Sequence, residues 1–221
     1  MKRRIIFITG TDTGVGKTVF ATLLVTYLRE SGFSVAGFKP VCSGGRSDAL
    51  AMYAALGGTV DLDEINPWHF RAAISPLLAA RVEKRRVTLS QVVTRAEALQ
   101  ERFPVLIMEG AGGILSPLGV GFDSRDLIKA LRAIPVVVAP NRLGVINHAL
   151  LTLESLPGNI SRRTQLVLVS QRKADSSARG NIEYLRQRLG PRVHELPQIK
   201  SPRQERRTAE MLASCVKAMG L

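Results

Sequence analysis

The chain has 221 residues, 45% of them hydrophobic and 22% charged, which is the balance of a globular protein with a sizeable core. Its longest apolar stretch has the length of a strand and falls well short of the roughly 20 residues of a membrane span. Two cysteines are too few for a disulfide framework or a zinc site, so we expect a single domain over residues 1–221 in the reducing cytoplasm, with no membrane partner. The net charge of +13 is concentrated after Arg162, but no aromatic residues interleave these charges, so we interpret them as a solvated face and expect no nucleic-acid partner.

The first predicted strand, residues 5–8, runs directly into Gly10-Thr11-Asp12-Thr13-Gly14-Val15-Gly16-Lys17-Thr18, and helical spacing of apolar residues then continues to residue 31. The glycines let successive backbone N–H groups point at one anion, Lys17 can reach the outer phosphates of a nucleotide, and the Thr18 hydroxyl suits Mg²⁺. Five residues rather than the usual four separate Gly10 from Gly16, and an ordinary glycine-rich turn is the alternative. Because a strand precedes the segment and a helix follows it, we predict a phosphate-binding loop.

Apolar patterns predict the remaining elements in chain order. The predicted strands are 33–38, 104–108, 135–139 and 165–169, and the predicted helices are 47–56, 88–102, 123–132, 145–156, 177–189 and 203–219. Ser47 and Asp48 are predicted to cap the second helix, and the irregular stretch 59–87 has the length of loops that serve a site. Strands that alternate with helices and are apolar along their length are typical of an α/β fold with a mainly parallel, doubly wound sheet and helices on both faces.

Four strand ends bring polar or flexible residues to one edge of this predicted sheet, where ligands bind in such folds. They are the phosphate loop, 39–48, 109–113 and 141–148. Lys17 and Lys39 can bring two cations to one phosphate, while Thr18, Asp48 and Glu109 can hold Mg²⁺ through hard oxygens. Taken singly, Lys39 could face solvent, Asp48 could only cap its helix, and Glu109 could be a surface acid. Their joint position beside a phosphate loop favours phosphoryl transfer.

The chain contains, in order, the segments 9–18 (TGTDTGVGKT), 37–44 (GFKPVCSG), 47–49 (SDA), 109–113 (EGAGG) and 143–152 (LGVINHALLT). Together they resemble the dethiobiotin synthase family, closely over about residues 4–155 and loosely beyond. The resemblance implies a P-loop NTPase-like three-layer sandwich and a ligase of biotin biosynthesis that uses ATP and Mg²⁺. The implied reaction converts diaminopelargonic acid, CO₂ and ATP into dethiobiotin, ADP and phosphate.

The resemblance also implies roles for individual residues. Lys39, Lys17 and Thr13 match catalytic positions, and Ser43 matches a substrate contact. The implied magnesium ligands are Thr18, Asp48 and Glu109. The implied nucleotide-binding residues are Gly14, Val15, Gly16, Lys17, Thr18, Val19, Asp48, Glu109, Gly110, Ala111, Gly112, Ser170, Gln171, Pro197, Gln198 and Ile199. Family members are homodimers in which the residues that match Gly144, Val145 and Asn147 lie near the substrate carboxylate across the interface, so we expect a homodimer.

The chain departs from the family pattern at two places. Gly14 stands where many relatives have glutamate, which removes one acidic contact near the reacting groups. Ser170-Gln171 stands where an Asn-Asp pair reads adenine in the family, with Pro197-Gln198-Ile199 as the segment that could compensate. Triphosphate binding is therefore predicted, while the preference for a base stays open.

Two alternative functions remain. One is a ParA/MinD-like switch ATPase, which would give the basic surface a purpose on DNA or a membrane. Such proteins carry a second lysine early in the phosphate loop, and residues 11–16 contain none. The other is a relative that keeps the nucleotide site but acts on a different amine. The motifs together favour the synthase.

Overall fold

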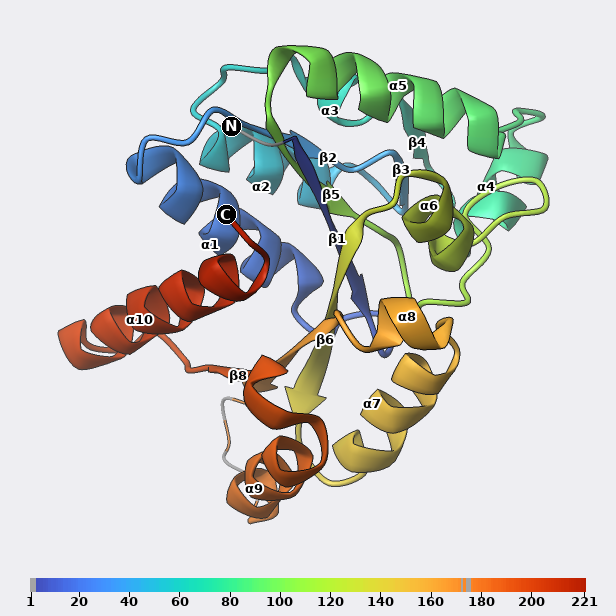
Figure 1. Cartoon of the computed structure of the whole chain (residues 1–221). Coiled ribbons are helices and arrows are strands. Elements are labelled where there is room, and N and C mark those ends of the chain that lie inside the picture. The colour runs from blue at the N-terminus through green and yellow to red at the C-terminus, as the bar shows by residue number, and fades with distance from the viewer. Residues whose placement is uncertain (1–2, 172, 174–175) are drawn as a thin grey trace.

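The computed structural model of the chain describes residues 3–171, 173 and 176–221. Its main sheet consists of β1 (Arg4–Gly10), β2 (Val35–Phe38), β5 (Val105–Glu109), β6 (Ile134–Asn141), β7 (Gln165–Ser170) and β8 (Val193–Leu196). The strands lie in the order β2-β5-β1-β6-β7-β8, and each adjacent pair is parallel (Figure 1). All their carboxyl ends therefore meet at one edge of the sheet.

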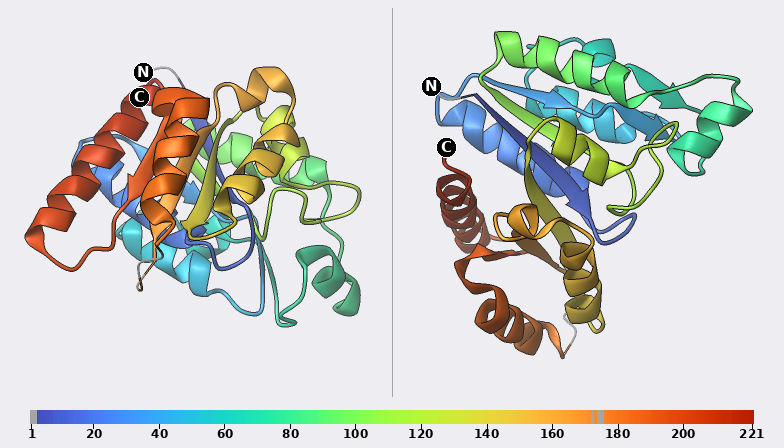
Figure 2. Two further views of the ribbon diagram at one scale, coloured as in Figure 1. Left: turned by 90° about the horizontal axis from the view of Figure 1, so that it is seen from below. Right: turned by 45° about the vertical axis from the view of Figure 1, so that its right-hand side comes forward.

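Helices cover both faces of this sheet (Figures 1 and 2). One face carries α1 (Lys17–Glu30), α2 (Ser47–Ala55) and α10 (Pro202–Ala218), and the other carries α5 (Leu89–Arg102), α6 (Ser124–Ala130), α7 (Val145–Glu154) and α9 (Ala178–Leu189). Right-handed crossovers place a helix on one face when the chain moves one way across the sheet and on the other face when it moves back. The predicted doubly wound α/β sandwich is confirmed.

The strands are buried because nearly all their side chains are apolar. Strand β5 reads VLIME and is buried throughout, as are the last six residues of β1. One core cluster joins β1, β2 and β5 to α1 and α5, and a smaller cluster lies among β6, β7, α7 and α9. Glu109, the last residue of β5, is therefore a carboxylate inside the protein and needs polar partners.

Side chains cap two of the helices. Thr88 caps α5 through a capping box with Gln91, in which each side chain bonds the backbone N–H of the other residue. Asp123 caps α6 by accepting from two backbone N–H groups of the first turn. Each helix begins at the residue that follows its cap, one residue after the predicted start.

The predicted cap of α2 is wrong. The N-cap is Arg46 and no side chain caps the helix, so Ser47 and Asp48 form its first turn. The Asp48 carboxylate bonds the Lys39 ammonium rather than the end of its own helix. A short acidic side chain is favourable at either position, so the sequence alone did not separate them.

Several short elements are absent from the sequence-based prediction. A separate two-stranded parallel sheet pairs β3 (Val41–Ser43) with β4 (Trp68–Phe70). The stretch 59–87, predicted to be irregular, contains β4, α3 (Leu62–Ile65) and α4 (Pro76–Val82). Strand β8, helix α8 (Gly158–Ser161) and the 3₁₀ turn Gly190–Arg192 are further additions. Elements of three or four residues are too short to show a period, and the seven residues of α4 make only about two helical turns.

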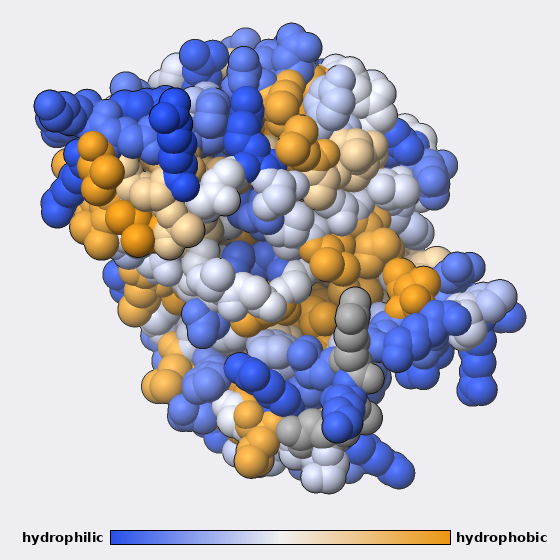
Figure 3. Space-filling model, turned by 180° about the vertical axis from the view of Figure 1, so that it is seen from behind, coloured by the Kyte–Doolittle hydropathy of each residue, from blue (hydrophilic) through white to orange (hydrophobic). Residues whose placement is uncertain are grey.

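The surface in Figure 3 carries separate hydrophobic clusters among hydrophilic side chains. Arg179 pairs with Glu183 on α9, and Arg206 pairs with Glu210 on α10, all four with exposed side chains. Part of the C-terminal positive charge is thus solvated and paired on helix faces. In the described part of the chain, every helix is too short or too polar to cross a membrane.

Candidate active site

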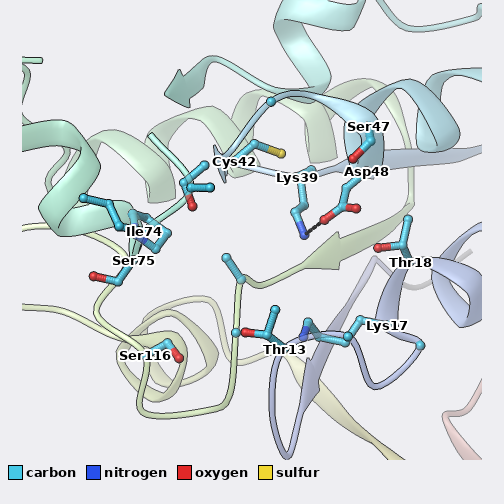
Figure 4. A pocket seen from close by; sticks show the side chains of 18 of the residues that line it. Thr13, Lys17, Thr18, Lys39, Cys42, Ser47, Asp48, Ile74, Ser75 and Ser116 are labelled. Carbon is cyan, nitrogen blue, oxygen red and sulfur yellow. Dashed lines mark ion pairs between the residues drawn. The ribbon is translucent and has the colours of Figure 1, made fainter. Parts of the chain in front are cut away.

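A cavity of about 710 Å³ opens at the carboxyl ends of β1, β2 and β5 (Figure 4). The predicted site residues that line it are Thr13, Gly14, Gly16, Lys17, Thr18, Val19, Lys39, Ser43, Asp48, Ala111 and Gly112. They come from three of the four strand ends that the sequence brings to this edge. The fourth, 141–148, does not line the cavity.

Glycines shape the phosphate loop between β1 and α1. Gly14 and Gly16 have φ values of 71° and 101°, which favour glycine. Gly16 also lies against β7, because a Cβ there would meet Val169 Cγ2 at 3.2 Å. Val15 is buried in the core, so only its backbone can serve a phosphate. The loop presents the N-terminus of α1 to the cavity, an arrangement that suits an anion.

Lys17 begins α1, and its Nζ donates to the Asp12 carbonyl at 2.7 Å. Burial lowers the pKa of Lys17 to about 8, helped by the positive charge of Lys39 and opposed by the nearby carboxylates. Near pH 8 the ammonium is therefore only half protonated. A phosphate group beside it would favour the charged form.

Lys39 lines the cavity, yet its side chain is only 2% exposed. Its Nζ lies 2.7 Å from Glu109 Oε1, 2.8 Å from Asp48 Oδ2 and 2.9 Å from the Gly110 carbonyl oxygen. Burial alone would lower the pKa of Lys39, but the charges of Glu109 and Asp48 outweigh burial and raise it above its ordinary value. Lys39 is therefore a fixed cation that can hold an anion, and it does not serve as a base.

Glu109 is fully buried at the end of β5. Its Oε1 accepts from Lys39 Nζ and from Thr18 Oγ1, the latter at 2.8 Å. Its other oxygen, Oε2, has no hydrogen-bond partner among the described residues. Leaving a buried carboxylate oxygen unpaired costs free energy. This atom therefore marks a place that suits a cation or a water.

The three predicted magnesium ligands are brought together and fit that ion. Thr18 and Asp48 line the cavity, and Glu109 adjoins them through its bond to Thr18. Burial would raise the pKa of Asp48, but the Lys39 charge and hydrogen bonds from Lys39 and Thr18 lower it below its ordinary value, so the carboxylate is ionised at neutral pH. Hydroxyl and carboxylate oxygens are the hard ligands that Mg²⁺ prefers, and this ion completes its octahedron with waters and phosphate oxygens.

The loop after β5 forms another wall of the cavity. Ala111 and Gly112 line it, and Gly110 supplies the carbonyl that holds Lys39. Gly112 has a φ of 68°, and a Cβ there would collide with Ser116 Oγ. Glycine at this position thus allows the loop to fold tightly on itself.

The segments 170–171 and 197–199, predicted to contact the base, lie side by side at the ends of β7 and β8 but do not line the cavity. Gln198 Nε2 donates to the Ser170 carbonyl at 3.4 Å. Ser170 Oγ donates to Glu195 Oε1 at 3.2 Å. Gly16 of the phosphate loop packs against Val169, the residue that precedes the first of these segments.

The residues predicted to meet the substrate carboxylate lie at the start of α7. Gly144 is the N-cap of that helix with a φ of 90°, Val145 is buried, and Asn147 is exposed. None of the three lines the cavity. Within one chain they are separate from Lys39 and Asp48.

Other residues line the cavity without having been predicted. They are Cys42, Gly45, Ser47, Ser116 and the segment 73–76, several of which Figure 4 labels. For the segment 73–76, the only signal in the sequence was its place in the long irregular stretch 59–87. Burial raises the pKa of the Cys42 thiol to about 11, so it is neutral at physiological pH.

Two solved structures share the fold along almost the whole chain. The MinC:MinD cell division protein complex of Aquifex aeolicus matches with a TM-score of 0.61 at 15% identity, covering 99% of this chain and 96% of that one. A pNOB8 ParA structure bound to nonspecific DNA also gives 0.61, at 10% identity and 99% coverage of both chains. At these identities the likeness shows the fold alone.

Sequence relatives are much closer. The AAA domain family model matches residues 4–206. The ATP-dependent dethiobiotin synthetase of Methanocaldococcus jannaschii is 43% identical over 155 residues, which cover 68% of this chain and 72% of the relative. That of Anaeromyxobacter dehalogenans is 45% identical over 155 residues, covering 68% and 70%. The chain therefore belongs to the dethiobiotin synthetase family of AAA-domain proteins.

Proposed function

We propose that the chain is an ATP-dependent dethiobiotin synthetase, which carboxylates diaminopelargonic acid and closes its ureido ring. The observation that carries the proposal is the Lys39 ammonium, which is buried, charged, paired with Asp48 and turned toward the same cavity as the phosphate loop (Figure 4). A cation fixed beside a phosphate loop suits an anion that attacks phosphorus. The relatives from Methanocaldococcus jannaschii and Anaeromyxobacter dehalogenans are named for this activity.

The proposed reaction has three steps. One substrate amine attacks CO₂ and loses a proton, which gives a carbamate anion. A carbamate oxygen then attacks the γ-phosphorus of ATP and ADP leaves, which gives a mixed carbamic-phosphoric anhydride. The second amine attacks the carbonyl carbon of this anhydride, loses its proton and expels phosphate, so the ring closes.

Lys39 suits the second step. Its ammonium is held by Glu109, Asp48 and the Gly110 carbonyl, so its charge is fixed at the cavity and would neutralise the carbamate. Lys17, at the head of α1, would stabilise charge on the phosphoryl group in transfer. Thr13 and Ser43 line the cavity and would contact substrate.

Thr18, Asp48 and Glu109 would hold Mg²⁺, which when bound neutralises the β- and γ-phosphate oxygens of ATP. Asp48 contacts Lys39 as well. It would therefore link the metal ligands to the cation that holds the carbamate.

We propose further that residues 1–221 act as one domain in a cytoplasmic homodimer, without a nucleic-acid partner. Gly144, Val145 and Asn147 of one copy would then meet the substrate carboxylate bound to the other. Two observations support this arrangement: these residues start α7 at the edge where the cavity opens, and they do not line the cavity of their own chain. The N-terminus of a helix suits a carboxylate.

Substrate-dependent turnover tests the proposal. With diaminopelargonate, bicarbonate and MgATP, the purified chain should release phosphate and form dethiobiotin, which mass spectrometry detects. A matched acid that carries only one of the two amines should give no cyclic product. Hydrolysis stimulated by duplex DNA, with no dethiobiotin formed, would overturn the proposal in favour of a ParA/MinD-like switch ATPase. Turnover with a different amine, and none with diaminopelargonate, would assign a different substrate.

A further inference from the structure

The backbone of Lys39 is supported by the segment that follows α3. Strand β2 ends at Phe38, and Pro40 has no N–H to donate, so the sheet no longer pairs the chain here. The Lys39 N–H donates to the Ile65 carbonyl at 2.8 Å. The Asn66 side chain, which is 0% exposed, donates through Nδ2 to the Lys39 carbonyl at 2.7 Å. Residues 65–66 thus replace the sheet as the partner of this backbone.

The same asparagine holds the start of α2. Its Oδ1 accepts from Arg46 Nε at 3.2 Å, and Arg46 Nη2 donates to the carbonyls of Leu62 and Asn66 at 3.0 and 3.1 Å. Arg46 is the N-cap of α2, and Asp48 lies two residues further on. Because the Asp48 carboxylate lies 2.8 Å from Lys39 Nζ, these contacts close a ring that begins and ends at Lys39.

We propose that Asn66, oriented by Arg46, is a positioning residue that sets where the Lys39 ammonium and the Asp48 carboxylate lie in the cavity. The inference rests on the proposed synthetase function. Asn66 does not line the cavity, so it acts through these two side chains. The Asn66 amide donates to the Lys39 carbonyl and accepts from the Arg46 guanidinium. If its O and N atoms were exchanged, oxygen would face the carbonyl and NH₂ would face the guanidinium, so both bonds would be lost.

Replacement of Asn66 should affect turnover more than ATP binding. A displacement of about 1 Å at a reacting group can cost about 100-fold in rate. The phosphate loop is carried by β1 and α1, which these hydrogen bonds do not involve. We therefore expect Asn66→Asp and Asn66→Ala to lower the kcat of dethiobiotin formation by about 10- to 100-fold. The KM for ATP should stay within about twofold.

Gln165→Ala is the matched control. Gln165 is also a buried amide, 5% exposed, and it bonds His194 at 2.9 Å and the Arg163 carbonyl at 3.3 Å. It begins β7 at the end of the sheet away from the cavity. This variant should lose stability as Asn66→Ala does but keep the wild-type kcat, measured below the melting temperature of both. Asn66→Ser replaces Asn66→Ala if the latter does not fold.

A double-mutant cycle and a second readout complete the test. If Arg46 acts through Asn66, the losses of kcat in Arg46→Ala and Asn66→Ala should not add in the double variant. The ¹⁵Nζ signal of Lys39 in the nucleotide-free protein, assigned with Lys39→Arg, should shift and its protons should exchange faster in Asn66→Asp.

The two readouts separate the possible failures. A wild-type chain that forms no dethiobiotin refutes the proposed function, while the Lys39 signal still decides the role of Asn66. An unchanged Lys39 signal, or a loss of kcat no larger than that of Gln165→Ala, overturns the positioning role.

Discussion

Lys39 and Glu109 form an ion pair of 2.7 Å whose side chains are 2% and 0% exposed. Removing two charges from water costs free energy that their mutual attraction often does not repay, so a buried ion pair contributes little to folding stability. Here the pair lies beside a cavity and keeps an ammonium charged where an anion can approach. The second carboxylate oxygen, Glu109 Oε2, has no partner among the described residues, although Thr18 bonds the first oxygen, Oε1. The arrangement is more easily explained by chemistry than by folding.

Removing the Lys39 ammonium should separate binding from turnover. In Lys39→Ala, ATP affinity should stay within about threefold, because the phosphate loop is untouched, while dethiobiotin formation should fall by at least about 100-fold. Calorimetric titration with ATP and product analysis measure the two effects. Because Glu109 would be left unpaired, Lys39→Arg serves as a second variant that keeps the charge. Equal losses of affinity and turnover would mean that Lys39 serves the nucleotide instead.

Lys17 should govern binding and turnover together. Lys17→Ala removes the cation that reaches the outer phosphates, so the Kd for ATP should rise and kcat should fall in the same variant. Titration calorimetry and phosphate release measure the two quantities. A variant with wild-type ATP affinity would contradict the role given to Lys17.

The lowered pKa of Lys17 predicts a pH dependence. Only the protonated ammonium favours a phosphate, so ATP affinity should be level below the pKa of about 8 and weaken as the pH rises above it. At pH 9, binding should take up a proton, which calorimetry in buffers of different ionisation enthalpy detects. Lys17→Arg should abolish this dependence, because a guanidinium stays charged. A wild-type affinity that is flat between pH 7 and pH 9 would refute the assignment.

Glu109 should determine the magnesium requirement. In Glu109→Gln the unpaired Oε2 loses its charge, so the Mg²⁺ concentration for half-maximal turnover should rise, with Glu183→Gln on the exposed face of α9 as the control. Turnover measured across a Mg²⁺ titration checks this. If the two titrations coincide, Glu109 is no part of a metal site.

Base selection should be weak and open to improvement. Ser170 Oγ is already bonded to Glu195, so it is less available to hydrogen-bond a nucleotide base than the asparagine amide at the matching position of the family would be. Ser170→Asn should raise the ratio of kcat/KM for ATP over CTP and GTP by about fivefold, the effect of one hydrogen bond of about 1 kcal/mol. Turnover with a panel of nucleotides measures the ratio. If Ser170→Asn leaves the ratio unchanged, the nucleotide base does not bind at residue 170.

The long elements and the phosphate loop could be predicted because their signals are local. Strands β1, β5, β6 and β7 are continuous apolar runs, and the glycines before α1 need no distant partner. Lys39 could be placed at the sheet edge because a parallel strand must end there. Its support by Asn66 could not be predicted, because that contact spans 27 residues and Asn66 follows α3, a four-residue helix that is too short to show a period. The position of Asp48 at this edge could likewise be predicted, whereas the separate prediction that it caps α2 is wrong, because its carboxylate bonds Lys39 instead.

The small sheet of β3 and β4 stands outside the six-stranded ladder, yet Cys42 and Ser43 of β3 line the cavity. Three paired residues on each strand give this wall much less cooperative protection than β1, which is paired on both sides. Deuterium should therefore replace its amide protons long before those of the central strands. Local opening of this wall would admit the amine substrate while the nucleotide stays bound at the phosphate loop.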